Sequence, residues 1–202
     1  MPELPEVEAV ATALRPLVRG STIRRGRVIH PIAVRPSSQR WRHGGKGAEA
    51  AARKFVAQVR GRKIIDVERR GKYLLLRLDR GYVVLHFRLD GQLVWFDSHK
   101  IKGHVDVAFH TSSGTLGFLD RRHFGRASWV ENLEDAQGVN RLGVDPLAKE
   151  FTSEHLIKIL ASSRRPLKEI LLDQAESPES ETSIRAKRCG ARGSTLASPR
   201  IA

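Results

Sequence analysis

The start of the chain combines a secondary amine with two carboxylates, carried by Pro2, Glu3 and Glu6. Removal of Met1 would leave Pro2 with a free α-amine, whose pKa of about 8 is far below that of a lysine. The positive end of a helix that begins at Pro5 would disfavour protonation further. A neutral amine can attack a sugar carbon and form a Schiff base, and neighbouring carboxylates can move the protons. The structural alternative is a helix-start proline followed by glutamates that complement the helix dipole.

Cationic and apolar side chains in three later segments could bind nucleic acid. Lys72 lies in RRGKYLLLRL, at the expected mouth of a β-hairpin, where a lysine is a suitable point charge for phosphate. Leu89 lies in HFRLDG, and Arg122 and Phe124 lie in DRRHFG. Each residue also has a structural interpretation. Lys72 would then be a solvated strand-edge lysine, and Leu89 and Phe124 would be buried at hairpin ends.

The net charge favours a polyanionic partner. Lysine and arginine number 36 against 22 acidic residues, which gives a formal net charge of +14. Each phosphate that such a chain neutralises releases counterions, so nucleic acid is the expected partner, and a basic protein without that role is the alternative. No apolar run approaches the roughly 20 residues that span a bilayer, and the acidic start lacks the regions of a signal peptide. We therefore expect a cytoplasmic, nucleoid-associated protein with no membrane partner.

The residue pattern predicts an α+β fold, in which an N-terminal helix precedes a β-sandwich and further helices follow. Val7, Val10, Leu14 and Leu17 recur at helical spacing. Short segments rich in β-branched and aromatic residues then alternate with glycine-containing turns, and residues 37–47 read as a loop. The predicted strands span residues 22–29, 63–68, 73–78, 82–87, 92–96, 105–109, 115–119 and 127–130. Closely spaced hairpins of this kind are typical of a sandwich.

Helical patterning replaces strand patterning after Leu133. Thr152 or Ser153 can cap a helix that continues through Ile159, and Pro166 can open another. Beyond residue 174 the apolar residues are scattered among small, polar and basic ones, as in disordered segments.

The chain resembles the formamidopyrimidine-DNA glycosylase and endonuclease VIII family. Its start, MPELPEVEAV, is similar to the family's N-terminal signature almost residue for residue, in the ELPEVE form of the oxidised-purine branch. Weaker likenesses are RRGKYLLLRL, HFRLDG for the family's HLGMSG, DRRHFG for DPRRFG, KGHVD for KHxHVD and LGVDPL for LGPEPL. The resemblance implies that Pro2 is the nucleophile, Glu3 the acid/base that opens the deoxyribose ring, and Glu6 a supporting catalytic carboxylate. Lys72 would contact the lesion-side phosphate and assist catalysis.

The same resemblance assigns DNA-binding roles. Leu89 would fill the void left by a flipped base, Arg122 would pair with the orphaned base, and Phe124 would wedge into the stack. Unstacking costs a few kcal/mol, which such inserted side chains offset. Lys102, which stands where the family usually has a histidine, and Lys168 would contact phosphates. This chain departs from the family pattern at four loop positions: Arg88 and Asp90 replace small residues, Arg121 replaces a proline, and His123 replaces the second arginine.

The function that the resemblance implies is base-excision repair. The enzyme would remove oxidised purines, namely 8-oxoguanine and formamidopyrimidines, through a proline Schiff base, and would nick the strand by β,δ-elimination. Its partner would be double-stranded DNA with oxidised bases or abasic sites, and it would act as a monomer. Two alternatives remain: a damaged-DNA binding module without turnover, and a ribosome-associated basic β-protein. A ribosome-associated protein would not explain why Pro2, Glu3, Lys72 and Phe124 occur together in one chain.

Three parts are expected along the chain: a catalytic β-sandwich domain over residues 1–132, a partial helix–two-turn–helix domain over 133–174, and an aberrant tail over 175–202. The tail shows neither the family's GIGNIYA-type motif nor its four-cysteine zinc finger, and Cys189 is the single cysteine. In the neighbouring reading frame, residues 176–196 are compatible with the family's continuation, so we interpret the tail as the product of a frameshift. We therefore expect no metal or cofactor in this chain.

Overall fold

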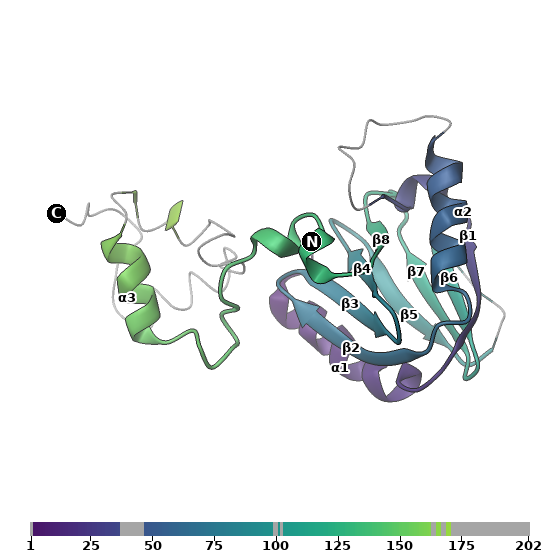
Figure 1. The fold of residues 1–202 in the computed structure, drawn as a ribbon, viewed down its shortest axis with the longest axis horizontal. Helices are drawn as coiled ribbons and strands as arrows, with labels where there is room; N and C mark the ends of the chain where they lie inside the picture. Colours follow the sequence, from purple (N-terminus) through teal and green to yellow (C-terminus); the bar gives the residue numbers. More distant parts are fainter. Residues whose placement is uncertain are drawn as a thin grey trace. The chain divides into compact units, whose positions relative to one another are not determined.

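Two compact units, residues 1–140 and 141–202, make up the chain in the computed structural model (Figure 1). The structure describes residues 2–36, 47–98, 101, 103–162, 165–166 and 169–170. Two predicted phosphate contacts, Lys102 and Lys168, lie outside these described residues, as does the predicted aberrant tail. None of the helices in the described part of the chain has the length and apolar character needed to cross a membrane.

Helix α1 (Leu4–Val18) opens the first unit and packs along strand β2 (Ile64–Arg70). Its apolar stripe recurs every three or four residues, and the buried side chains are Leu4, Val7, Ala11, Leu14 and Val18. Arg15 fixes the helix to the strand, because its guanidinium donates hydrogen bonds of 3.0 and 2.8 Å to the Val67 carbonyl oxygen. The helix predicted at the start of the chain is therefore present.

Within the described residues, eight strands form two four-stranded antiparallel sheets, with orders β1-β6-β7-β5 and β2-β3-β4-β8 (Figure 1). The strands besides β2 are β1 (Ile23–Val28), β3 (Tyr73–Leu78), β4 (Tyr82–His86), β5 (Gln92–Phe96), β6 (Val105–Thr111), β7 (Thr115–Leu119) and β8 (Arg126–Val130). In the second sheet, His86 at the end of β4 pairs with Tyr73 on one side and Arg126 on the other. The β2–β3, β4–β5 and β7–β8 loops therefore meet at one end of this sheet. They carry four of the nine residues for which the sequence predicts a function, namely Lys72, Leu89, Arg122 and Phe124.

The inner faces of the two sheets share one hydrophobic core. Phe109 and Phe118 enter it from the first sheet, and Leu74, Leu76 and Leu85 enter it from the second, all fully buried. Burying a side chain of this size contributes roughly 1.5–3 kcal/mol. The predicted α+β class, with a helix leading into a sandwich, is confirmed.

Helix α2 (Gly47–Val59) covers β1 and was not predicted from the sequence. Its buried residues, Ala52, Phe55 and Val59, are few, and its remaining length is largely alanine and charged or polar residues. The Phe55 and Phe109 rings meet edge to face with centroids 6.0 Å apart. The helix packs closely over Gly26, because a Cβ at that position would lie 3.0 Å from Val59 Cγ2.

Short helical segments follow the sandwich. The 3₁₀ helices η2 (Leu133–Asp135) and η3 (Val139–Arg141) bring Ala136 and Val139 against Leu75, Val84 and Val130 on the second sheet. In the second unit, helix α3 (Ser153–Ala161) begins at Thr152, whose Oγ1 accepts a hydrogen bond from the His155 amide at 3.2 Å. The predicted cap is therefore confirmed, while the predicted domain boundaries at 132 and 174 stay predictions.

Candidate active site and nucleic-acid interface

A cavity of about 610 Å³ lies at the N-terminal end of α1. Pro2 and Glu6 line it together with residues 89–92 from the β4–β5 loop, residues 103–104 ahead of β6, and residues 119–121 after β7. Segments that are far apart in the sequence thus meet around the N-terminal imino acid. The two loops that resemble the family's DNA-inserting segments open into the same cavity as Pro2.

The start of α1 is held by a backbone contact of Glu6. Its carboxylate accepts a hydrogen bond from the Glu3 backbone N–H at 2.7 Å, and Glu3 occupies the N-cap position with extended backbone. This contact satisfies one of the amide groups that a helix N-terminus leaves without an intrahelical partner. Pro2 and Glu3 are half-buried, whereas Glu6 is exposed. The contact therefore gives Glu6 a positioning role toward Glu3.

The β4–β5 loop holds Leu89 out of the core. Leu89 is 43% exposed, so it is not the buried turn leucine of the structural alternative. Arg88 beside it adopts a left-handed backbone with φ of 56°. Conformations of this kind favour glycine and are strained for an arginine, so the rest of the loop must impose this one. The Gly91 amide donates to the Phe87 carbonyl oxygen at 2.9 Å and closes the loop.

The β7–β8 loop is organised by Asp120, which is 1% exposed. Its carboxylate accepts hydrogen bonds from the backbone amides of Arg122 at 2.9 Å and Gly125 at 2.5 Å. Only glycine fits at position 125, because a Cβ there would lie 2.5 Å from Phe118 Cζ. These restraints present the Phe124 ring to solvent with 46% exposure, as insertion into a base stack requires.

Arg122 joins the two loops. Its Nη2 donates to Asp90 Oδ1 at 2.6 Å, and its Nε contacts Asp90 Oδ2. The guanidinium carbon also lies 5.9 Å from the centre of the Phe124 ring. The predicted reader of the orphaned base is therefore paired with a carboxylate that stands at one of the chain's departures from the family pattern.

Lys72 lies at the same end of the sandwich as the β4–β5 loop. It is half-buried in the β2–β3 turn, next to Tyr73, which pairs with His86 across the sheet. Burial first, and then the charges of Arg88, Lys72 and Arg126, lower the pKa of His86 to about 4. The His86 Nδ1 accepts a hydrogen bond from the Arg88 amide at 3.0 Å. His86 is therefore neutral at physiological pH beside several cations.

Arg35, Arg88 and Arg126 extend this group of cations. Burial first, and then repulsion by Arg35 and Arg88, lower the pKa of Arg126 to about 10. Burial likewise lowers the pKa of Arg35, with a further contribution from Arg88. Arg126 Nη1 donates to the carbonyl oxygens of His123 and Gly125 at 3.1 and 2.6 Å. Cations that repel one another in this way favour binding of an anion such as a phosphate.

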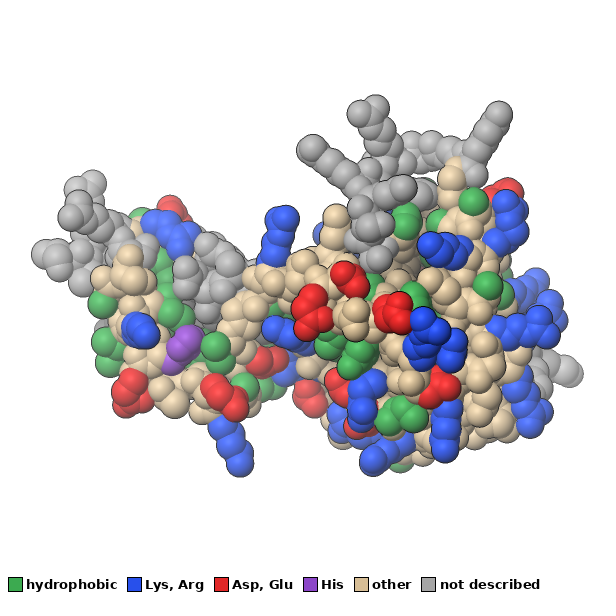
Figure 2. Space-filling view, in the orientation of Figure 1, with side chains coloured by type: hydrophobic (Ala, Val, Ile, Leu, Met, Phe, Trp, Pro, Cys, Tyr) green, Lys and Arg blue, Asp and Glu red, His purple; other side chains and the backbone are tan. Residues whose placement is uncertain are grey.

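Basic side chains also occur away from these loops. Figure 2 shows lysine and arginine side chains along the side of the first unit where α2 and β1 lie. Arg24, Arg25 and Arg27 of β1 are exposed there. Charges on an edge strand also discourage pairing with strands of other molecules, so this surface alone does not define a DNA interface.

The structure brings most of the predicted site residues to one end of the sandwich. Pro2, Glu6 and Leu89 line the cavity, and Arg122 lies next to the lining residue Arg121. Three contributions were not predicted as functional: Asp90 as the partner of Arg122, Asp120 as the organiser of its loop, and Arg126 as a half-buried cation. Of these three roles, only that of Asp120 could have been predicted from the sequence, because an aspartate that precedes a tight loop ending in glycine often accepts hydrogen bonds from backbone amides.

The comparisons with known proteins match the part of the chain that carries the candidate site. The sequence profile of the formamidopyrimidine-DNA glycosylase N-terminal domain matches residues 1–127. Two similar relatives are the formamidopyrimidine-DNA glycosylases of Lactobacillus helveticus, 37% identical over 181 residues, and Moorella thermoacetica, 38% identical over 180 residues. These matches cover 87% and 86% of this chain, and the chain spans 60% and 61% of the length of the two relatives.

Solved structures show the same architecture. The MutM (Fpg) protein of Thermus thermophilus matches with a TM-score of 0.68 and 33% identity, over 87% of this chain and 59% of that one. Lactococcus lactis Fpg in complex with DNA containing N7-benzyl-Fapy-dG matches with a TM-score of 0.68 and 25% identity, over 87% and 62%. Fold and sequence thus place the chain among proteins in which a helix precedes a β-sandwich. The chain belongs to the formamidopyrimidine-DNA glycosylase family, whose N-terminal domain residues 1–127 match.

Proposed function

We propose that this chain acts in base-excision repair as a DNA glycosylase with AP lyase activity, directed at oxidised purines such as 8-oxoguanine and formamidopyrimidines. The observation that carries the proposal is the cavity in which Pro2 meets the β4–β5 and β7–β8 loops. The nucleophile can reach the glycosidic carbon only when the base has left the stack. A site for this reaction therefore needs the nucleophile next to the segments that extrude the base. Double-stranded DNA is the proposed partner, and the relatives' names support this.

The proposed covalent step uses the α-amine of Pro2 after removal of Met1. Its nitrogen lone pair attacks the sugar C1′, the bond from C1′ to the base breaks, and the base leaves with a proton. The dipole of α1 favours the neutral amine. Glu3 would donate a proton to the ring oxygen as the sugar opens to the Schiff base, and Glu6 would hold Glu3 in place through its 2.7 Å contact. Elimination of both flanking phosphates would then nick the strand.

Base extrusion would use the exposed side chains of the two loops. Leu89 and Phe124 are 43% and 46% exposed and are held by loops with restrained backbones, so they can replace stacking contacts. Arg122 would leave Asp90 and pair with the orphaned base, because an arginine can donate two parallel hydrogen bonds to a base edge. Lys72 and the half-buried Arg35 and Arg126 would bind the backbone phosphates on either side.

Borohydride trapping on a duplex with one 8-oxoguanine tests the covalent step. Mass spectrometry first verifies that Met1 is absent from the purified chain. We expect a covalent protein–DNA adduct with the parent chain, no adduct with Pro2→Gly, and a reduced yield of nicked strand with Glu3→Gln. Binding of lesion DNA without any adduct would support the alternative, a damaged-DNA binding module. Equal binding of RNA and lesion DNA without an adduct would support a ribosome-associated protein.

A further inference from the structure

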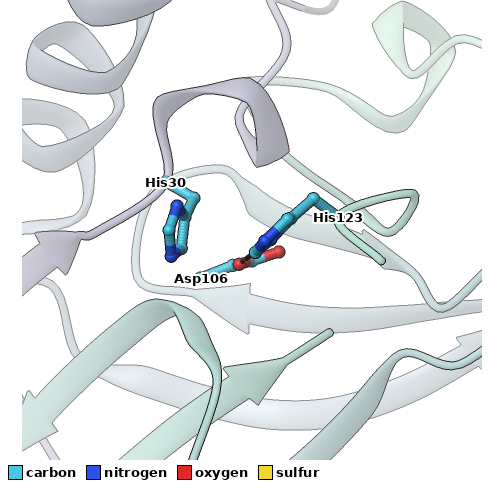
Figure 3. Close-up of side chains that lie close together, drawn as sticks. All are labelled: His30, Asp106 and His123. Carbon is cyan, nitrogen blue, oxygen red and sulfur yellow. Dashed lines mark hydrogen bonds and ion pairs between the residues drawn. The ribbon is translucent and has the colours of Figure 1, made fainter. Parts of the chain in front are cut away.

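Two histidines and an aspartate gather at one edge of the first sheet, and none of them lines the cavity that holds Pro2 (Figure 3). His30 follows β1, Asp106 belongs to β6, and His123 lies in the β7–β8 loop. His123 Nδ1 lies 2.7 Å from Asp106 Oδ1, and the two imidazole ring centres are 4.3 Å apart. One nitrogen or oxygen atom from each residue lies within 4.8 Å of those of the other two.

The carboxylate of this group has unused capacity to bind a cation. Asp106 is fully buried, and its Oδ2 has no hydrogen-bond partner in the described part of the chain. The ionic partner that the described residues give it is His123, whose imidazole is charged only when protonated. A buried carboxylate oxygen without a partner destabilises the fold by about 1–3 kcal/mol or more. Some further cation or donor at this point would therefore be favourable.

We propose that His30, Asp106 and His123 bind a divalent first-row transition metal ion, for which zinc is the best match. Two imidazoles and a carboxylate are a ligand set that such ions accept, and solvent can complete the coordination. At bond lengths of about 2.0–2.2 Å, tetrahedral ligand atoms lie about 3.4 Å apart. From separations of at most 4.8 Å, the ligand atoms of the two half-buried imidazoles and of Asp106 would need to close in by up to about 1.4 Å. The sequence alone had predicted no metal here.

The backbone around the site is already fixed. The amides of Ile29 and His30 both donate to the Asp106 carbonyl oxygen, at 2.8 and 3.3 Å, which holds His30 beside β6. His123 adopts a left-handed backbone with φ of 55°, a conformation that this loop must impose. A metal ion would therefore connect β1, β6 and the loop that presents Arg122 and Phe124. Its role would be to hold that loop in place.

The residue at position 123 gives a reason why this chain would need a metal. The family pattern DPRRFG has an arginine where this chain has His123. An arginine next to Asp106 would bring a permanent cation of its own, whereas a histidine can bind a metal ion through a ring nitrogen. An external cation would restore the balance of charge.

Zinc titration of the full chain by calorimetry, in a Cys189→Ser background that removes the single thiol, tests the site. We expect one zinc ion per chain and a higher melting temperature with zinc. His30→Asn and His123→Arg should each weaken binding by more than the roughly 10–100-fold typical of losing an outer-shell partner. His123→Arg should still fold, because the arginine can pair with Asp106. The matched control, His155→Gln in α3, should bind zinc like the parent, and magnesium should not compete, since it prefers oxygen ligands.

Zinc binding of equal strength in the parent and in His30→Asn and His123→Arg would overturn the proposal, and so would a parent that binds no zinc. The group would then be a hydrogen-bonded histidine–aspartate pair only. The readout is metal binding and melting temperature, so its failure is distinguishable from a failure of the proposed DNA chemistry.

Discussion

Arg122 is held by a contact that would have to break before this side chain could take its proposed role of pairing with a base. The pair with Asp90 is bidentate, but both side chains are about half exposed, at 49% and 42%. An exposed ion pair of this kind is worth up to about 1 kcal/mol, which corresponds to about fivefold in an equilibrium constant. Asp90 also adds a negative charge where DNA would approach. Asp90, which replaces a small residue of the family pattern, is thus expected to weaken DNA binding.

Asp90→Ser should therefore tighten binding of a duplex with an abasic-site analogue by roughly three- to tenfold, because Arg122 is released and a repulsive charge is removed. Fluorescence anisotropy at fixed ionic strength measures the dissociation constant. The matched control is Glu131→Ser, which removes one charge from the similarly exposed pair with Arg80. If both variants tighten binding equally, net charge is the cause, and release of Arg122 is not.

His86 makes the stability of the fold depend on pH. Its pKa is about 4 in the folded chain, against 6.5 for an ordinary histidine, because of burial first and the nearby cations second. Between these values the unfolded chain binds the proton more readily than the folded chain does. The free energy of unfolding should therefore fall as pH drops below about 6.5 and stop responding to this group below about 4.

His86→Asn should flatten that dependence, since an asparagine oxygen can still accept the Arg88 amide but does not titrate. Urea unfolding of both chains between pH 5 and 7.5 measures the difference. One proton gives at most about 1.4 kcal/mol per pH unit, and less here because the ring is partly exposed. Parallel pH profiles of parent and variant would assign the acid sensitivity to other groups.

At the scale of elements, the sequence predicted those parts that local chemistry determines. Strands β3, β5 and β7 have the predicted limits, because β-branched and aromatic runs there are bounded by glycine and polar turns. Helix α2 was missed because its burial depends on Phe55 meeting Phe109 of a distant strand, which no local pattern shows. The pairing of Arg122 with Asp90 spans 32 positions and likewise depends on how two loops meet.

The β7–β8 loop should be sensitive to one added methyl group. Gly125→Ala would place a Cβ 2.5 Å from Phe118 Cζ and 3.0 Å from Asp120 Oδ2, in the core and at the carboxylate that organises the loop. We expect a loss of about 1–3 kcal/mol in the free energy of unfolding and weaker DNA binding, because the strain displaces Phe124. Gly47→Ala is the matched control, since a Cβ there meets nothing within 4 Å. Equal stability of the two variants would show that the loop has room to relax.

At the scale of the whole molecule, the charge of +14 would explain attraction to DNA but not where the proposed DNA partner would bind. Basic side chains occur both at the loop end of the sandwich and along α2 and β1 (Figure 2). In non-specific electrostatic attraction, all of these basic side chains would contribute alike. At a defined interface, the salt dependence of the DNA association constant would instead come from the few cations that face phosphates.

The salt dependence of binding separates these cases. The logarithm of the association constant falls linearly with the logarithm of salt concentration, by about 0.9 for each phosphate neutralised. Lys72→Gln should therefore lower this slope by about 1 on duplex DNA with an abasic-site analogue. Lys54→Gln, which removes the same charge from the exposed face of α2, should leave the slope unchanged. If both substitutions lower the slope alike, DNA senses only the net charge, and the cluster around Lys72 is not the phosphate-binding surface.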